Sequence, residues 1–199
     1  MSYLITQSLL NSWLYLYKTD EEDKAKRSFS NALNRVSSPP TKAMQNGIDF
    51  ENAVYSYCFD NSVHLPACWE KGVKGVSRYI QGGVFQLSAS TKRHIAGLDF
   101  VLYGRLDALK KGTIYDVKFS ECYKCGKYID SPQHPMYFAI CPEVSRFVYV
   151  ISDGEEVWTE AYTRQETPDI NVTIEQFVDY LKSDKLLDTY CKKWESKYG

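Results

Sequence analysis

The sequence predicts a mixed α/β fold, with a central mixed β-sheet flanked by helices, in a single domain over residues 1–199. Apolar residues recur at helical spacing before, between and after segments in which they alternate with polar residues, so helices and strands interleave. The length of 199 residues suits one domain with a sizeable core. The 44% hydrophobic and 25% charged residues are typical of a globular protein.

The first part of the chain has a helical pattern. Three helices are expected there, over residues 7–18, from Gly47 onward and around 66–80. Between the first two, the polar segment 19–46 includes a short helical stretch and then a proline pair through which no helix continues. We expect this segment to be irregular or mobile. The second helix would carry Glu51 in its first turn.

Strands follow these helices. Alternation with a period of two predicts three strands, over 84–93, 98–110 and 113–119. A tight turn joins the last two strands into a hairpin. A helix comes next, capped by Ser131 with Pro132 in its first position. The remaining elements are two strands and a long closing helix, over 145–152, over 156–164 and from about residue 173.

Composition and charge narrow the function class. The amino-terminal segment has no basic lead, and polar residues interrupt its apolar run, which argues against a signal peptide or a membrane span. We therefore expect a cytoplasmic protein without a membrane partner, whose six cysteines stay reduced. The formal net charge of −1 gives no overall attraction to polyanions. A nucleic-acid site would need clustered basic residues or bound metal.

The hairpin places three charged side chains on neighbouring strands. Side chains alternate along a strand, so Asp116 and Lys118 point to the same face, while Asp107 precedes the turn among apolar neighbours. A carboxylate buried among strands is costly unless it is paired or binds a cation. Two carboxylates beside a lysine suggest ligands for a hard cation, with an ammonium aimed at an anion. A cross-strand salt-bridge cluster is the alternative that this spacing leaves open.

Four short motifs resemble, in the same order, those of the PD-(D/E)XK nuclease superfamily. The segments "GRLD" at 104–107 and "DVK" at 116–118 resemble its GxxD and DxK motifs. The upstream "NGIDFENAV" resembles the helical G-x-x-x-E motif, with Glu51 as the acid. Gln133 and Tyr137 match the Q-x-x-x-Y spacing of the RecB-like branch, which includes phage-type exonucleases.

This resemblance implies a restriction-endonuclease-like core and a metal-dependent nuclease that cleaves DNA, as an exonuclease of phage-recombination type. One or two Mg²⁺ or Mn²⁺ ions would be its cofactor. The implied metal ligands are Glu51, Asp107, Asp116 and the carbonyl group of Val117. Lys118 would orient or deprotonate the attacking water and neutralise charge in the transition state. Gln133 and Tyr137 would support the site and the scissile strand.

Other interpretations stay open from the sequence. An endonuclease of restriction or repair type could use the same core, and a non-catalytic nucleic-acid-binding subunit could retain it. Glu51 could simply complement a helix dipole, Gln133 could be a first-turn polar residue, and Tyr137 could be a core aromatic residue. Some phage exonucleases that resemble this chain form closed rings, so a homo-oligomer or a recombination-protein partner is also left open.

A basic stretch without acidic residues is the candidate DNA-binding segment. It runs from Lys71 to Arg93. The residues assigned to substrate binding are Lys74, Arg78, Lys92 and Arg93. The alternative is that these side chains form an ordinary solvated surface.

The cysteine pattern bears on a second cofactor. Cys122 and Cys125 form a CxxC pair, and some RecB-like nucleases carry an iron–sulfur cluster. Those relatives have one cysteine before the nuclease core and three after it. Here the first cysteine is Cys58, and only Cys141 and Cys191 follow the pair. We therefore expect no iron–sulfur cluster, and a zinc site with distant partners is left open.

Overall fold

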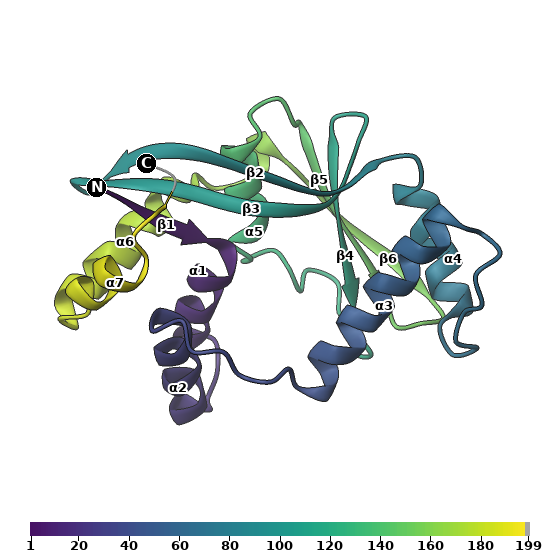
Figure 1. Ribbon diagram of the computed structural model, residues 1–199, viewed down its shortest axis with the longest axis horizontal. Coiled ribbons are helices and arrows are strands. Elements are labelled where there is room, and N and C mark those ends of the chain that lie inside the picture. The colour runs from purple at the N-terminus through teal and green to yellow at the C-terminus, as the bar shows by residue number, and fades with distance from the viewer. Residues whose placement is uncertain (198–199) are drawn as a thin grey trace.

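The computed structural model describes residues 1–197. It contains a six-stranded mixed sheet with helices on both faces (Figure 1), which confirms the predicted fold class. The strands are β1 (Ser2–Thr6), β2 (Val84–Ile95), β3 (Leu98–Lys110), β4 (Thr113–Phe119), β5 (Arg146–Ser152) and β6 (Val157–Thr163). The helices are α1 (Gln7–Leu14), α2 (Glu22–Leu33), α3 (Lys42–Phe59), α4 (Glu70–Ile80), α5 (Gln133–Ile140), α6 (Ile170–Ser183) and α7 (Leu187–Lys193), with short 3-10 turns η1 (Tyr15–Tyr17) and η2 (Arg164–Glu166).

Strand β3 organises the sheet because its 13 residues are enough to pair with two strands on one side. On one side, β2 runs antiparallel along nearly the whole of β3. On the other side, β1 lies parallel to Asp99–Tyr103, and β4 lies antiparallel to Ala108–Lys110. The stretch 104–107 of β3 therefore has no strand partner on that side. Strand β5 continues the sheet parallel to β4, and β6 is antiparallel to β5.

Two apolar cores cover the two faces of the sheet. The larger core contains residues from α1, α2, α5, α6 and α7, with contacts such as Trp13 on Phe177 at 5.4 Å between ring centroids. The smaller core lies under α3 and α4, where Phe50 packs 5.0 Å from Phe119. Ile114 belongs to the larger core and its strand-mate Val117 to the smaller. Strand β4 is thus covered on both faces.

Several element predictions were wrong in detail. Strand β1 was not predicted, because its five residues are too few to show a clear alternation and only Ile5 is fully buried. The segment 19–46 contains the whole of α2, and α3 already begins at Lys42, because Thr41 caps it by accepting a hydrogen bond from the Met44 amide. The long closing helix is in fact two helices, separated near Lys185, whose φ is +59°.

The hairpin strands have the predicted bounds, 98–110 and 113–119. The next helix, α5, is capped by Pro132, so the predicted cap Ser131 lies one residue too early. The Ser131 hydroxyl nevertheless accepts a hydrogen bond of 3.2 Å from the backbone amide of Gln133. Within residues 1–197, no helix has both the length and the apolar character needed to cross a membrane.

Candidate functional site

Asp107 and Asp116 face each other where the β3–β4 ladder stops. The paired residues of this ladder are Lys110 with Thr113, Leu109 with Ile114 and Ala108 with Tyr115. Asp107 and Asp116 are the next residues in sequence beyond the Ala108–Tyr115 pair, and the charge of Asp116 acts on the pKa of Asp107. Beyond this pair a side chain replaces the backbone ladder, because Asp107 Oδ2 accepts a hydrogen bond of 2.9 Å from the Val117 amide.

Tyrosine hydroxyls from two helices fill the unpaired stretch of β3. The carbonyl of Arg105 accepts a hydrogen bond of 2.8 Å from the Tyr137 hydroxyl, on α5. The carbonyl of Asp107 accepts a longer one, 3.4 Å, from the Tyr55 hydroxyl on α3. A buried carbonyl without a partner would destabilise the sheet, so these tyrosines substitute for a missing strand. They also bring α3 and α5 to the two carboxylates.

Asp116 is buried, with 3% of its surface exposed. Its Oδ1 accepts a hydrogen bond from the Gln133 side-chain amide, and its Oδ2 lies 2.6 Å from the Lys118 ammonium in an ion pair. Within residues 1–197, the Lys118 ammonium is thus the partner of this buried oxygen. A carboxylate oxygen is costly to bury without a cation beside it, and the Lys118 ammonium is that cation here.

The charged side chains of the hairpin shift one another's pKa values. Burial and the neighbouring Asp116 hold the pKa of Asp107 well above its usual value. Burial likewise raises the pKa of Asp116, although Lys118 opposes this effect. Burial disfavours the charged form of Lys118, but Asp116 and Asp107 outweigh it, and the pKa of the ammonium is raised. The site therefore has an excess of carboxylate that a cation would relieve.

Glu51 comes from the middle of the 18-residue helix α3, not from its first turn as predicted. The helix-dipole interpretation of this residue is therefore wrong, because the dipole acts within the first and last turns. Glu51 Oε1 accepts hydrogen bonds from the Tyr55 hydroxyl at 2.7 Å and from the side-chain amide of Gln86 at 3.0 Å. Its charge contributes to the raised pKa values of Asp107 and Asp116, which places the carboxylate near both.

Helix α5 supplies Gln133 and Tyr137 to the same region, as the Q-x-x-x-Y spacing predicted. Both side chains are buried, one against Asp116 and the other against β3. Tyr137 also explains the glycine of the GxxD motif. A Cβ atom at position 104 would overlap Tyr137 Cε1, so only glycine leaves room for the ring.

The donor set has the chemistry of a hard-cation site, but it is not assembled around an ion. Within residues 1–197, no three His, Cys, Asp or Glu side chains are grouped closely enough to hold a metal. Asp116 is engaged by Lys118 and Glu51 by Tyr55. The Val117 amide points to Asp107, and the N–H and C=O of one strand residue face the same side, so the Val117 carbonyl also faces the gap. Carboxylate and carbonyl oxygens are suitable ligands for Mg²⁺.

The four predicted substrate-binding residues do not form one surface. Lys74 and Arg78 lie on α4, whereas Lys92 and Arg93 lie near the end of β2, across β3 from β1, at the other end of the molecule (Figure 1). Lys74 is also paired with Glu70 at 2.5 Å. A single groove built from the whole basic stretch is therefore ruled out, because a strand and a helix carry its two halves apart.

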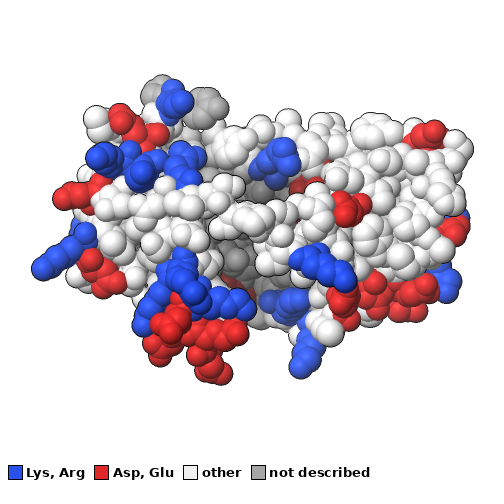
Figure 2. Space-filling view, turned by 60° about the horizontal axis from the view of Figure 1, so that its bottom comes forward, with Lys and Arg blue, Asp and Glu red and all other residues white. Residues whose placement is uncertain are grey.

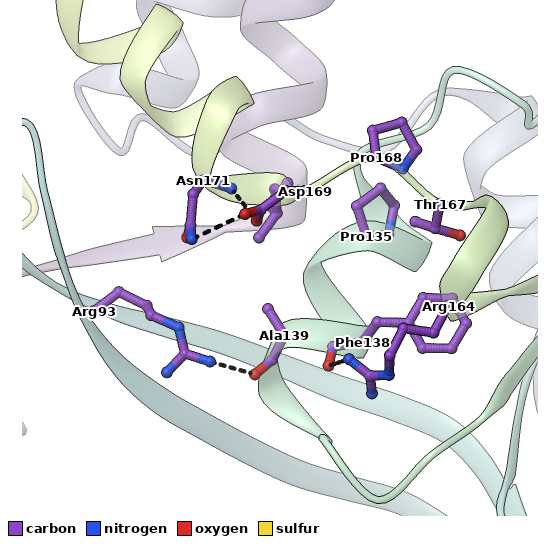
Figure 3. Close-up of a pocket in the computed structure, with 10 residues that line it drawn as sticks. Arg93, Pro135, Phe138, Ala139, Arg164, Thr167, Pro168, Asp169 and Asn171 are labelled. Carbon is purple, nitrogen blue, oxygen red and sulfur yellow. Dashed lines mark hydrogen bonds between the residues drawn. The ribbon is translucent and has the colours of Figure 1, made fainter.

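Arg93 has a structural role at its own location. It donates a hydrogen bond of 3.1 Å to the carbonyl of Ala139, at the edge of a pocket of about 280 Å³ (Figure 3). Arg164 lines the same pocket and donates to the carbonyl of Phe138 at 2.7 Å. These arginines satisfy carbonyl groups at the end of α5. None of the predicted metal ligands lines this pocket.

The surface charge is mixed around the middle of the molecule. Figure 2 shows a face that is hollowed near its centre, with Lys and Arg side chains on both sides of the hollow and Asp and Glu side chains interspersed among them. This distribution agrees with the formal net charge of −1. Binding of a polyanion would therefore depend on a few well-placed cations rather than on a broad basic surface.

Sequence reasoning missed two polar residues of the site. Tyr55 could have been found, because it lies one helical turn after Glu51. Gln86 gave no signal, since it reaches Glu51 only through a positive φ of +55° within β2. The cysteines of the CxxC pair, Cys122 and Cys125, are both exposed, and no third ligand for zinc accompanies them among residues 1–197.

Comparisons with known proteins support the fold. No family model matches the chain, and no curated protein matches it. Among solved structures, the fold is similar to that of SSO0001, with a TM-score of 0.54 and 13% identity over 92% of this chain and 78% of the other. It is also similar to LHK-Exo in complex with dAMP, with a TM-score of 0.51 and 13% identity over 95% of this chain and 92% of the other.

Proposed function

We propose that this chain is a metal-dependent nuclease that hydrolyses DNA phosphodiester bonds, with exonuclease activity. The observation that carries the proposal is the pair of buried carboxylates, Asp107 and Asp116, which lie beside the Lys118 ammonium with the charge of Glu51 acting on both. Three carboxylates near one ammonium leave an excess of negative charge that a salt-bridge cluster built only for stability would not need. The four motifs and the likeness in fold to LHK-Exo, an exonuclease by its name and solved with dAMP, support the same conclusion.

A divalent cation would be held by the carboxylates of Asp107 and Asp116, with Glu51 and the Val117 carbonyl as further ligands. When bound, such an ion activates water and stabilises the developing charge on phosphate and leaving oxygen. Lys118, whose ammonium lies 2.6 Å from Asp116, would stand beside such an ion and be available to the substrate phosphate.

The protein side chains would then have separate tasks. Lys118 neutralises negative charge on the phosphoryl oxygens, where an ammonium in a partly buried site is worth more than in water. Gln133 fixes the orientation of the Asp116 carboxylate through its amide. Tyr55 and Gln86 fix Glu51 in the same way. Tyr137 fills the space above Gly104 and keeps α5 against β3.

The proposal is tested by incubating the protein with linear and covalently closed circular DNA in Mg²⁺ or Mn²⁺, with EDTA as the control. Exonuclease activity predicts degradation of linear DNA alone, abolished by EDTA. Cleavage of both forms would replace the exonuclease by an endonuclease on the same core. DNA binding without any cleavage would favour a non-catalytic subunit and overturn the proposal.

A further inference from the structure

The segment between β4 and α5 lies beside the candidate site. It follows Lys118 and Phe119 directly and ends at Gln133, so both of its ends are attached to site residues. Apart from turns it has no regular structure, and most of its side chains are exposed. Connections of this kind often carry binding residues on a rigid scaffold. We call residues 120–132 the β4–α5 loop.

A buried carboxylate holds this loop to the sheet. Glu160 of β6 is 7% exposed, and its two oxygens accept three hydrogen bonds. The donors are the Tyr123 hydroxyl at 2.8 Å, the Tyr128 amide at 3.2 Å and the Tyr162 hydroxyl at 2.7 Å. Two of these donors belong to the loop. Burial of a carboxylate is costly unless it is fully hydrogen-bonded, so the arrangement fixes the position of the loop.

Stacked rings connect the loop to the catalytic strand. Tyr128 stacks on Tyr149, with ring centroids 4.6 Å apart and an interplanar angle of 18°. Tyr149 is the register partner of Asp116 in the β4–β5 pair. The Lys118 ammonium lies 6.0 Å from the same ring. Tyr128 is thus held close to the charges of the site, and both Lys118 and Asp116 influence its pKa, which burial raises.

The anchored loop presents a second ammonium beside the site. Lys127 donates a hydrogen bond of 2.8 Å to the hydroxyl of Ser120, which lies two residues after Lys118. Its ammonium is also 5.8 Å from the ring centre of Tyr128. No acidic residue within 1–197 forms an ion pair with Lys127, and the residue is exposed. A cation that is positioned by neutral groups and left without a counterion is suited to an external anion.

We propose that Lys127 binds a phosphate next to the scissile one along the DNA strand, and that Glu160 is the positioning residue that keeps the β4–α5 loop in place for this contact. This inference rests on the proposed nuclease function. It assigns substrate binding to the β4–α5 loop rather than to the basic residues of α4 and β2. Since phosphate contacts of this kind are made equally before and during reaction, they should affect KM rather than kcat.

The test compares Lys127→Ala with Lys124→Ala, a lysine of the same loop that has no side-chain hydrogen bond or ion pair within residues 1–197. Binding of a fluorescent DNA oligonucleotide is measured in Ca²⁺ at several salt concentrations. Lys127→Ala should weaken binding about fivefold to tenfold and lower the salt slope by about one, as expected for the loss of one phosphate contact. Lys127→Arg should restore both values, and Lys124→Ala should match the wild type.

Glu160→Gln provides the second arm, because it keeps the shape of the side chain but removes one strong acceptor. It should raise the Kd for DNA, and adding Lys127→Ala to it should weaken binding by less than the sum of the two separate losses. In kinetic assays, both variants should raise KM with kcat unchanged. An unchanged salt slope in Lys127→Ala, or additive losses with Glu160→Gln, would overturn the inference.

Failure of the proposed function is distinguishable from failure of this inference. If the wild-type protein binds DNA but never cleaves it, the nuclease proposal fails, while the Lys127 salt slope still decides whether Lys127 contacts a DNA phosphate. If the wild type cleaves DNA and Lys127→Ala behaves like Lys124→Ala, only the inference fails. A wild type that binds no DNA contradicts both.

Discussion

The two sides of the candidate site differ in how their charges are held. On the hairpin side, β3 and β4 hold Asp107, Asp116 and Lys118 among strands covered on both faces, and the three groups perturb one another's pKa values. On the loop side, residues 120–132 are mostly exposed, and a few anchors such as Glu160 fix their position. Dry, crowded charges suit bond making and breaking. A solvated cation such as Lys127 suits substrate binding.

The largest expected effect is on the hairpin side. Asp116→Asn should lower kcat by about 10³-fold or more, which corresponds to about 4 kcal/mol of activation free energy. Asp99→Asn on the same β3–β4 hairpin is the matched control, because Asp99 is exposed and, among residues 1–197, forms its ion pair with His94 alone, at 2.7 Å. It should leave kcat unchanged. Equal rates for wild type and Asp116→Asn would remove Asp116 from the site.

The second prediction concerns the stability of the fold and the residue His134, which lies in α5 directly after the β4–α5 loop. His134 is 1% exposed, stacks on Tyr162 at 4.1 Å and contacts the Tyr149 hydroxyl at 3.2 Å. Burial lowers its pKa from 6.5 to about 4, with Glu160 opposing the shift. The unfolded chain then takes up a proton at higher pH than the folded one. The stability due to neutral His134 is complete above about pH 6.5 and is lost as pH falls toward about 4.

The expected loss is about 2–3 kcal/mol of unfolding free energy for this group. Urea unfolding at pH 7 and pH 4.5 measures it, with His134→Gln as the comparison. The variant should show a smaller difference between the two pH values than the wild type. Identical differences would show that His134 is not buried in its neutral form.

The smallest effect tests the packing of the hairpin side with one substitution at two positions. Gly104→Ala forces a methyl group against the Tyr137 ring and should destabilise the fold by about 1–3 kcal/mol. Gly47→Ala meets no atom within 4 Å, inside α3, and should stabilise it by about 0.5–1 kcal/mol. Thermal unfolding measures both. A neutral Gly104→Ala would mean that the α5 helix is not held tightly against β3.

The hairpin side could be predicted from the sequence because its signals are local. A tight turn between two alternating strands sets Asp107 near Asp116, and the observed bounds of β3 and β4 match the predicted ones. The long-range features could not be predicted in this way. The gap between β1 and β4, the position of Gln86 beside Glu51 and the separation of Lys74 from Arg93 all depend on how distant elements pack.

The loop side shows the same limit more strongly. Nothing in the pattern of residues 120–132 indicates that Glu160, far along the chain on β6, accepts hydrogen bonds from two of its residues. The sequence drew attention to the basic run instead, where Lys71 and Lys74 turn out to be paired with Glu155 and Glu70. A count of basic residues along the chain does not show which of them lack a counterion in the fold.

The measurement that tests the central claim most directly is the location of a divalent ion in crystals of the protein soaked in Mn²⁺. An anomalous difference peak is expected at about 2.0–2.6 Å from carboxylate oxygens of both Asp107 and Asp116. Movement of the Lys118 ammonium away from Asp116 should accompany it, and Asp116→Asn crystals should lack the peak. A Mn²⁺ ion bound only elsewhere, with the Lys118–Asp116 ion pair intact, would contradict the account.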